Sequence, residues 1–228
     1  MTKLPLELRR MIYEEALRED SIHLSLLQGQ LNARRCNIHC CSCYISPFRK
    51  EKTLHMALPL LRTCRRIYSE AVEYLYKSNH FFISTDLEDY PTTGYLSYFF
   101  LPQRMAQVTN LSIHWDLDHQ QYFQVDLMRE RHRCEWFRSW EALSRLTGLR
   151  RLHIKLYFCL DLWEHCYGTF WTQNSRELLE PIKKITAPRD FVITLPNWKC
   201  STKIDVGNSR CVFKLPERDS SDNDEGSI

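Results

Sequence analysis

Residues 151–158 read RLHIKLYF, and residues 110–113 read NLSI. In the longer stretch, apolar residues at every second position alternate with Arg, His, Lys and Tyr, which is the pattern of a strand with one buried face. The shorter stretch begins 41 residues earlier and continues the same alternation through Trp115. Further strand-like runs lie at residues 80–84 and 191–195, and Ile193 follows Ile154 by 39 residues.

Helical periodicity separates these strands. It predicts helices over residues 127–146 and 173–185. A strand and a helix that recur about every 40 residues indicate βα units, whose strands must be parallel. We therefore expect an α/β (or α+β) fold in which three or four irregular, leucine-rich-like βα units form an arc or open sheet with helices outside. The alternative is a single nonrepeating α/β or α+β domain.

Two amphipathic helices are predicted before the first of these strands. The first begins near Pro5, with Arg9 on its charged side. Its apolar side is formed by Leu8, Met11, Ile12 and Ala16. The second is predicted as one continuous helix over residues 57–77. Residues 19–56 are an insertion between them, with a short hairpin around 22–31, and a further hairpin is expected in residues 200–215 with its turn at Gly207 and Asn208.

The composition excludes several classes of function. The chain has 228 residues and only six glycines, and it contains no GxGxxG, GxxxxGK[ST], HExxH or GxSxG stretch. The first two patterns cradle phosphates through backbone N–H groups, and the other two carry zinc-dependent and serine-dependent hydrolysis. We therefore expect no cofactor and no enzyme of these classes. With 43% hydrophobic and 26% charged residues, the chain is expected to bury a sizeable core.

The formal net charge of +3 hides an asymmetry along the chain. Residues 216–228, PERDSSDNDEGSI, carry −4 and are expected to be a disordered acidic tail, so residues 1–215 carry +7. This excess permits contact with an acidic partner. It falls short of the dense basic stripe of a dedicated nucleic-acid binder.

Ten cysteines raise the question of compartment. The first ten residues, MTKLPLELRR, lack the apolar segment of a secretory signal peptide. We therefore expect free thiols in the reducing cytoplasm or nucleus. No run is long and apolar enough to span a membrane, so the protein is expected to be soluble.

The N-terminal segments carry a resemblance to a known family. Residues 4–17, LPLELRRMIYEEAL, and residues 60–83, LLRTCRRIYSEAVEYLYKSNHFFI, resemble the fungal F-box-like domain family. Its members share the pattern LPxEhRxxIY, where h is apolar, followed by LLxTCRxIYxEAxxxLYxxNxF. The residues that fall on this pattern are Leu4, Pro5, Glu7, Arg9, Ile12, Tyr13, Leu61, Thr63, Cys64, Arg65, Ile67, Tyr68, Glu70, Ala71, Leu75, Tyr76, Asn79 and Phe81.

The resemblance implies a division of the chain and a function. Residues 1–83 would be an F-box-like helical region packed on the βα units of residues 84–215, with the tail at 216–228. In F-box proteins the Leu-Pro start and the following helices dock on the Skp adaptor of a cullin–RING ubiquitin ligase, and a C-terminal repeat domain selects the protein to be ubiquitinated. The chain is thus expected to be a non-enzymatic protein-interaction module, a substrate receptor or scaffold, with the adaptor and an unknown substrate protein as partners.

The candidate partner-binding residues are Leu4, Pro5, Leu8 and Ile12. They present small apolar groups on the first helix and suit a contact in which a helix lies in a groove of the partner. The alternative is that they pack on the second helix as ordinary core.

Other groups keep different functions open. A weak zinc candidate, weighed against free loop thiols, consists of Cys36, His39, Cys40 and Cys43. The alternative function, an enzyme or metal-dependent protein, would use groups at the ends of neighbouring strands, which are Asp116, Asp118, His119, Asp161, His165 and Cys166. Such residues also begin loops and cap helices. Nucleic-acid binding, the third function, would use Arg34, Arg35, Arg49, Lys50, Lys52, Arg62, Arg65 and Arg66.

Overall fold

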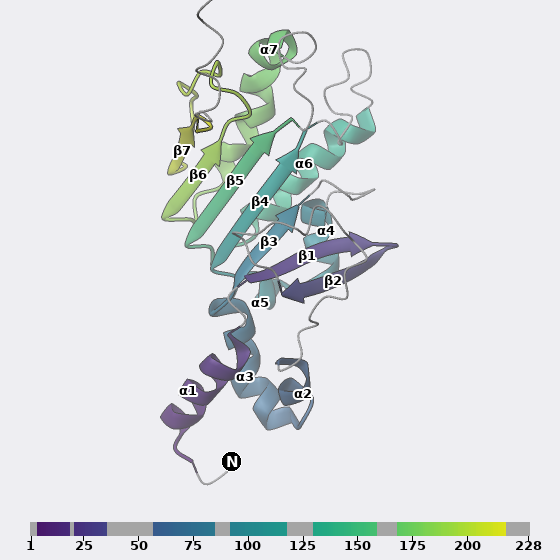
Figure 1. Ribbon diagram of the computed structural model, residues 1–228, viewed down its shortest axis with the longest axis vertical. Coiled ribbons are helices and arrows are strands. Elements are labelled where there is room, and N and C mark those ends of the chain that lie inside the picture. Colours follow the sequence, from purple (N-terminus) through teal and green to yellow (C-terminus); the bar gives the residue numbers. More distant parts are fainter. Residues whose placement is uncertain are drawn as a thin grey trace, which may run out of the picture.

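The computed structural model describes residues 4–18, 21–35, 57–84, 92–117, 130–158 and 168–217 (Figure 1). A twisted sheet forms the body of the molecule, and three N-terminal helices form a smaller group at one end of it. In chain order the elements are α1 (Leu6–Leu17), β1 (Ser21–Leu27), β2 (Gln30–Arg35), α2 (Ala57–Leu61), α3 (Arg65–Lys77), β3 (His80–Ser84), α4 (Thr92–Phe99), α5 (Pro102–Met105), β4 (Asn110–Asp116), α6 (Glu130–Ser144), β5 (Arg151–Tyr157), α7 (Gly168–Leu179), the 3-10 helix η3 (Glu180–Lys184), β6 (Asp190–Thr194) and β7 (Cys211–Lys214).

The described strands form one seven-stranded sheet in the order β2-β1-β3-β4-β5-β6-β7. Every neighbouring pair is parallel except β1 and β2, which form an antiparallel hairpin. In the register Ile113 lies opposite Ile154, and Ile154 lies opposite Ile193. The α/β fold class and the parallel βα units predicted from the 41- and 39-residue spacings are therefore confirmed.

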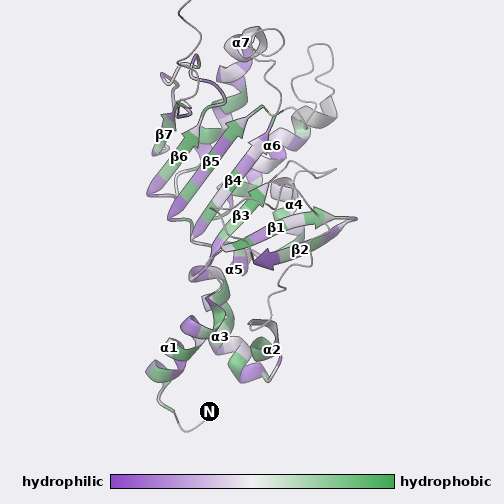
Figure 2. Cartoon of the chain, in the orientation of Figure 1, coloured by the Kyte–Doolittle hydropathy of each residue, from purple (hydrophilic) through white to green (hydrophobic). Residues whose placement is uncertain are grey.

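The sheet is covered by helices on one face. Along β5, buried Leu152, Ile154 and Leu156 alternate with exposed Arg151, His153 and Lys155, and Figure 2 shows this alternation as green and purple bands along the strand. The buried positions join a single core with side chains from α4, α6, α7 and η3. Figure 1 views the sheet from the opposite face, which these helices leave open.

The expected hairpin in the insertion exists, and it belongs to the sheet. Strands β1 and β2 are joined through Gln28 and Gly29, whose φ angles of 50° and 74° are those of a tight two-residue hairpin turn. Strand β1 also pairs in parallel with β3. Because Ile22 and Leu24 point into the same core as the βα units, the hairpin adds two strands to the sheet. The region predicted as a helical N-terminus up to residue 83 therefore also supplies β1, β2 and nearly all of β3.

The prediction of one continuous helix over residues 57–77 was wrong. The chain leaves α2 after Leu61, where the N–H groups of Arg62 and Thr63 donate to the carbonyls of Pro59 and Leu60, three residues back. Cys64 is then fully extended, and its sulfur accepts a hydrogen bond from the N–H of Ile67 at 3.5 Å. The apolar residues keep a helical spacing across this break, because α2 and α3 both contribute side chains to the same small core. The spacing alone therefore suggested one helix.

Two further expectations at the C-terminal end need correction. The helix predicted over 173–185 is α7 followed by the 3-10 turn η3, because Pro181 lacks the N–H that an α-helix requires. The hairpin predicted in residues 200–215 is absent, since β7 pairs in parallel with β6. The turn at Gly207 does form, with a φ of 56°. The side chain of Lys183 on η3 binds that of Asp205, which lies just before this turn in the loop between β6 and β7, at 2.7 Å.

Candidate functional site

The helices α1, α2 and α3 form a helical unit with its own core. Its buried apolar residues, Tyr13, Leu17, Leu61, Ala71 and Val72, make a cluster separate from the core of the sheet. In Figure 1 the unit projects from the end of the sheet at which β1 and β3 begin. This arrangement leaves much of the surface of α1 without contact to the sheet.

Asn79 joins the helical unit to the sheet. Its side chain is fully buried, and its Nδ2 donates to the carbonyl of Leu17 at 2.8 Å and to that of Leu75 at 2.9 Å. These carbonyls lie in the last turns of α1 and α3, just before the chain enters β1 and β3. Leu75 and Tyr76 reinforce the joint, since both pack against the core of the unit and the core of the sheet.

Two of the four candidate partner-binding residues, Leu8 and Ile12, lie on the outer side of α1, and Leu4 and Pro5 lie directly before its first turn. Leu4, Pro5, Leu8 and Ile12 are all exposed, with 47% of Leu8 open to solvent. The alternative that they form ordinary core is therefore wrong. The side of α1 that packs on α3 carries Tyr13 and Leu17 instead.

The four candidates did not include the most exposed residue of this surface, Met11, although the sequence had placed it on the apolar side of the helix. Met11 is 66% exposed and falls, by its spacing of three and one residues from Leu8 and Ile12, on the same side of the helix. We call Leu4, Pro5, Leu8, Met11 and Ile12 the α1 apolar face. Five neighbouring apolar residues exposed on a short helix and the segment just before it form a patch of the kind that marks interaction surfaces.

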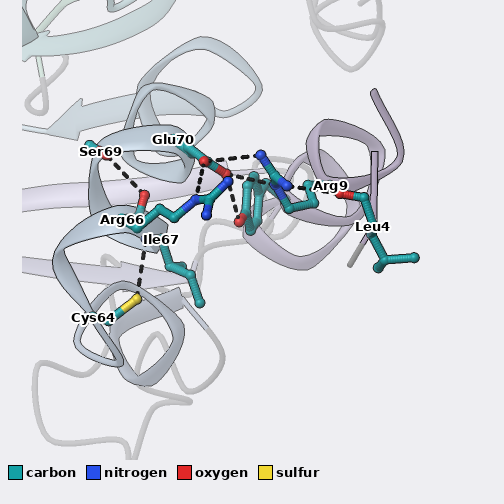
Figure 3. Close-up of polar contacts among 8 residues, drawn as sticks. Leu4, Arg9, Cys64, Arg66, Ile67, Ser69 and Glu70 are labelled. Atoms are coloured by element: carbon teal, nitrogen blue, oxygen red, sulfur yellow. Dashed lines mark hydrogen bonds and ion pairs between the residues drawn. The ribbon is translucent and has the colours of Figure 1, made fainter. Parts of the chain in front are cut away.

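A partly buried ion pair fixes the orientation of α1, and Figure 3 shows it. Arg9 donates from Nε and Nη2 to the two carboxylate oxygens of Glu70 on α3, at 2.9 and 3.1 Å. The same carboxylate accepts hydrogen bonds from the hydroxyl of Tyr13 at 3.2 Å and from Nε of Arg66 at 3.0 Å. The bonds from Arg66, and then those from Arg9 and Tyr13, hold the pKa of Glu70 below its ordinary value.

The placement of Arg9 on the charged, outer side of α1 was wrong. Its side chain is buried between the helices. The bidentate ion pair with Glu70 makes this possible, because it replaces the hydrogen bonds to water that the guanidinium loses on burial. Arg9 also donates from Nη1 to the carbonyl of Leu4 at 2.8 Å. This bond holds the segment before α1 in place, so the Leu-Pro start of the apolar face is ordered by the same residue that anchors the helix.

Most of the other candidate groups lie outside the described residues. This applies to Cys36, His39, Cys40 and Cys43, and also to Asp118, His119, Asp161, His165 and Cys166. Asp116 is described, and it is buried at the end of β4. Within the described ranges, no group of three or more His, Cys, Asp or Glu side chains is placed to hold a metal ion.

The basic stretch is divided between two distant parts of the molecule. Arg34 and Arg35 lie on the edge strand β2, whereas Arg62, Arg65 and Arg66 lie on the helical unit. Arg66 is engaged with Glu70. Arg49, Lys50 and Lys52 lie outside the described residues. The described arginines therefore do not form one continuous stripe.

Four described cysteines, Cys64, Cys134, Cys200 and Cys211, are free thiols, as predicted for them. Cys200 and Cys211 are buried in the sheet core, and burial raises their pKa to about 11 and about 12. They are therefore protonated at neutral pH and pack as small apolar groups.

Sequence reasoning also missed a concentration of histidines on the sheet face opposite the helices, a face that is largely buried over β1 and β3 and accessible over β5 to β7. His23, His80, His114 and His153 come from four neighbouring strands, and all occupy positions that face away from the helices. Rings of His23 and Phe82 lie 5.2 Å apart, and those of Phe82 and His114 lie 4.8 Å apart. The alternation in each strand contained this information, but only the sheet order shows that the polar positions of separate strands become neighbours.

His23 is expected to make the fold sensitive to acid. It is buried, neither ring nitrogen has a hydrogen-bond partner among the described residues, and burial, followed by the charges of Arg34 and His114, lowers its pKa to about 4. Because the unfolded state takes up the proton near pH 6.5, the stability that the neutral imidazole confers is complete above that pH and is lost as the pH falls towards 4. The part of the loss between pH 7 and pH 5 that is due to His23 is expected to be about 2 kcal/mol.

Urea unfolding at the two pH values measures this loss. The His23→Phe protein, which keeps an aromatic ring beside Phe82 but cannot take up a proton, should lose about 2 kcal/mol less than the parent protein over the same interval. An identical pH dependence in the two proteins would contradict the assignment.

Comparison with known families gives one result. The family model described as a domain of unknown function, DUF7730, matches residues 1–216. It therefore spans the helical unit and the whole sheet. No curated protein and no solved structure gives a significant match. Within the described ranges, no helix has the length and apolar character needed to cross a membrane.

Proposed function

We propose that this chain, which belongs to the DUF7730 family, is a non-enzymatic protein-interaction module, and specifically an F-box-type substrate receptor of a cullin–RING ubiquitin ligase. In this function the α1 apolar face docks on the Skp adaptor, and the sheet binds the protein to be ubiquitinated. Both partners would be met in the cytoplasm or nucleus. The resemblance of residues 4–17 and 60–83 to F-box-like domains supports the assignment.

The observation that carries the proposal is the exposure of the α1 apolar face on a helix whose other side is firmly packed. Leu8, Met11 and Ile12 are open to solvent, while Arg9 and Tyr13 tie the helix to Glu70. A helix held in this way presents its apolar residues without further ordering, which lowers the entropic cost of binding. Full burial of each of these side chains in a groove would contribute about 1.5 to 3 kcal/mol.

Binding of the purified chain to a purified Skp-type adaptor tests this function. The Leu8→Ala/Ile12→Ala protein should bind the adaptor about a hundredfold more weakly or worse, because two apolar anchors at the centre of the contact are removed. Its stability should change little, since both side chains are exposed and alanine favours the helix. Isothermal titration calorimetry measures the affinity, and thermal unfolding measures the stability.

A matched control uses polar residues of the same helix. Arg10 and Glu14 are exposed and take no part in the apolar face, so the Arg10→Ala/Glu14→Ala protein should bind nearly as well as the parent chain. Failure of the parent chain to bind the adaptor would refute the proposal. Equal binding by both double variants would also refute the role of the apolar face.

A further inference from the structure

The open face of the sheet is most accessible over its last three strands. Here the side chains that point away from the helices form three rows, each made of residues that lie opposite one another on adjacent strands. Most of these side chains are exposed or half-buried. We call this surface the open β5–β7 face. It consists of Arg151, His153, Lys155, Asp190, Val192, Thr194, Val212 and Lys214.

The open β5–β7 face carries an excess of positive charge. Arg151, Lys155 and Lys214 are exposed, and in the part of the chain that the structure describes none of them has a carboxylate at ion-pair distance. Arg151 donates to the amide oxygen of Asn110 at 2.7 Å, which orients the guanidinium and leaves its charge uncompensated. The one carboxylate of the face, that of Asp190, lies 3.2 Å from Nε2 of His153.

The pKa values of His80 and His114, which lie beside this face, are lowered in part by its positive charges. Burial, and then the charges of Arg151 and His153, lower the pKa of His80. Burial, and then the charge of Lys155, lower the pKa of His114 to about 4. In both cases a cation of β5 contributes to the shift, although His114 lies on the adjacent strand β4 and His80 lies one strand further away, on β3. A carboxylate placed over the face would therefore be attracted by several groups together.

The spacing of the three cations suits an extended chain. Lys155 and Lys214 lie in one row of the register with Thr194 between them, so their backbones are about 10 Å apart. Arg151 and Lys155 are four residues apart on one strand, which is about 13 Å. Extended polypeptide advances about 3.3 Å per residue and directs every second side chain to the same side, so acidic side chains four residues apart match the separation of Arg151 and Lys155. The long side chains of Lys155 and Lys214 cover the difference of about 3 Å between that spacing and their own separation.

We propose that the open β5–β7 face binds an extended acidic segment of a partner protein. As the docking surface for a ubiquitination substrate, this inference rests on the receptor function proposed above. An acidic polypeptide fits the face better than a nucleic acid does. Val192 and Val212 offer apolar contacts between the cations, Asp190 would repel a continuous row of phosphates, and three cations are few for phosphate binding.

Fluorescence anisotropy with defined probes tests the inference. The first probe is a labelled peptide of about ten residues with glutamate at every fourth position, which places all its carboxylates on one side of the extended chain at about the spacing of Arg151 and Lys155. The second is the same peptide with glutamine in place of glutamate. The third is a single-stranded oligonucleotide of equal formal charge. We expect the full-length chain to bind the glutamate peptide, to bind the other two much more weakly, and to lose affinity as salt is raised.

A triple charge reversal locates the site. The Arg151→Glu/Lys155→Glu/Lys214→Glu protein should bind the glutamate peptide about tenfold more weakly or worse, since each exposed ion pair contributes up to about fivefold. The matched control reverses three exposed cations on the helix-covered side of the molecule, Arg145, Arg176 and Lys184, and so changes the net charge equally. Its affinity should stay within about twofold of the parent chain.

The outcomes separate this inference from the proposed function. Absence of peptide binding, an equal loss in both triple variants, or tighter binding of the oligonucleotide than of the peptide would overturn the inference. Adaptor binding is measured on the same proteins, and the reversal on β5 and β7 should leave it unchanged because the α1 apolar face belongs to the separate helical unit. If the chain binds the peptide through the three cations and does not bind the adaptor, the acidic-segment site stands and the ligase function falls.

Discussion

Replacing Gly148 with alanine is expected to destabilise the protein by about 3 kcal/mol or more, at the upper end of the range for overpacking. A Cβ atom built on Gly148 would lie 2.0 Å from the carbonyl oxygen of Ala106, which is far inside contact distance. The obstacle is backbone, so it cannot be relieved by turning a side chain. Gly148 lies in the loop between α6 and β5, and Ala106 lies in the loop between α5 and β4. The absence of a side chain lets the backbones of these two loops lie in close contact.

Urea unfolding and the thermal midpoint measure this effect, and the midpoint should fall by about 10 °C. Gly29→Asn is the matched control. Gly29 has a φ of 74°, and a Cβ there meets nothing within 4 Å. Asparagine tolerates this conformation better than most residues, so the control should cost well under 1 kcal/mol. If Gly148→Ala is as stable as the control, the close contact of the loops is not a constraint on the fold.

Replacing Trp136 with alanine is expected to cost about 4 kcal/mol. Its ring is buried against those of Trp115 and Trp140, with centroids 4.8 and 5.7 Å away. Its Nε1 also donates to the carbonyl of Leu178 at 2.9 Å. The substitution therefore opens a cavity between the sheet and α6 and deprives a buried carbonyl at the end of α7 of a donor.

Two phenylalanine variants separate the hydrogen bond from the packing. Trp136 and Trp140 are equally buried, but the Nε1 of Trp140 has no acceptor among the described residues. Trp136→Phe should therefore be less stable than Trp140→Phe by about 1 kcal/mol, as measured by urea unfolding. Equal stability of the two variants would show that the bond to Leu178 contributes nothing measurable.

The parallel strands β3, β4, β5 and β6 were predictable because each carries its own evidence in its sequence. In β5 the alternation of Leu152, Ile154 and Leu156 with charged residues shows both the strand and its buried face. The recurrence of this pattern at a spacing near 40 residues then indicates that the strands are parallel and in register. Local periodicity and repeated spacing were enough to obtain the α/β class.

The break between α2 and α3 was not predictable in the same way. Cysteine is an unusual residue for capping a helix, so Cys64 gives no warning that the chain becomes extended there. The burial of Arg9 depends on Glu70, 61 residues away in the sequence. A charged side chain without a known partner is expected to be exposed, and that expectation placed Arg9 on the wrong side of α1.

The candidate site was predicted in part. The apolar character of Leu4, Pro5, Leu8 and Ile12 was visible in the sequence, but whether that side of α1 faces the core depends on where Tyr13 and Leu17 pack. The open face of the sheet was hidden for a different reason. Its residues are scattered over strands that lie far apart along the chain, and they meet only once the strand order is known.

The joint at Asn79 has a consequence for how the two proposed surfaces would work together. Because its side chain binds the ends of both α1 and α3, and Leu75 and Tyr76 pack against both cores, we expect the helical unit to keep a fixed orientation relative to the sheet. With partners bound at the α1 apolar face and the open β5–β7 face, the distance between the two partners would be set by this joint and not by a flexible linker. A bound substrate would then be held in a fixed orientation relative to the adaptor. Only those of its lysines that lie close to the ligase would have a high effective concentration there.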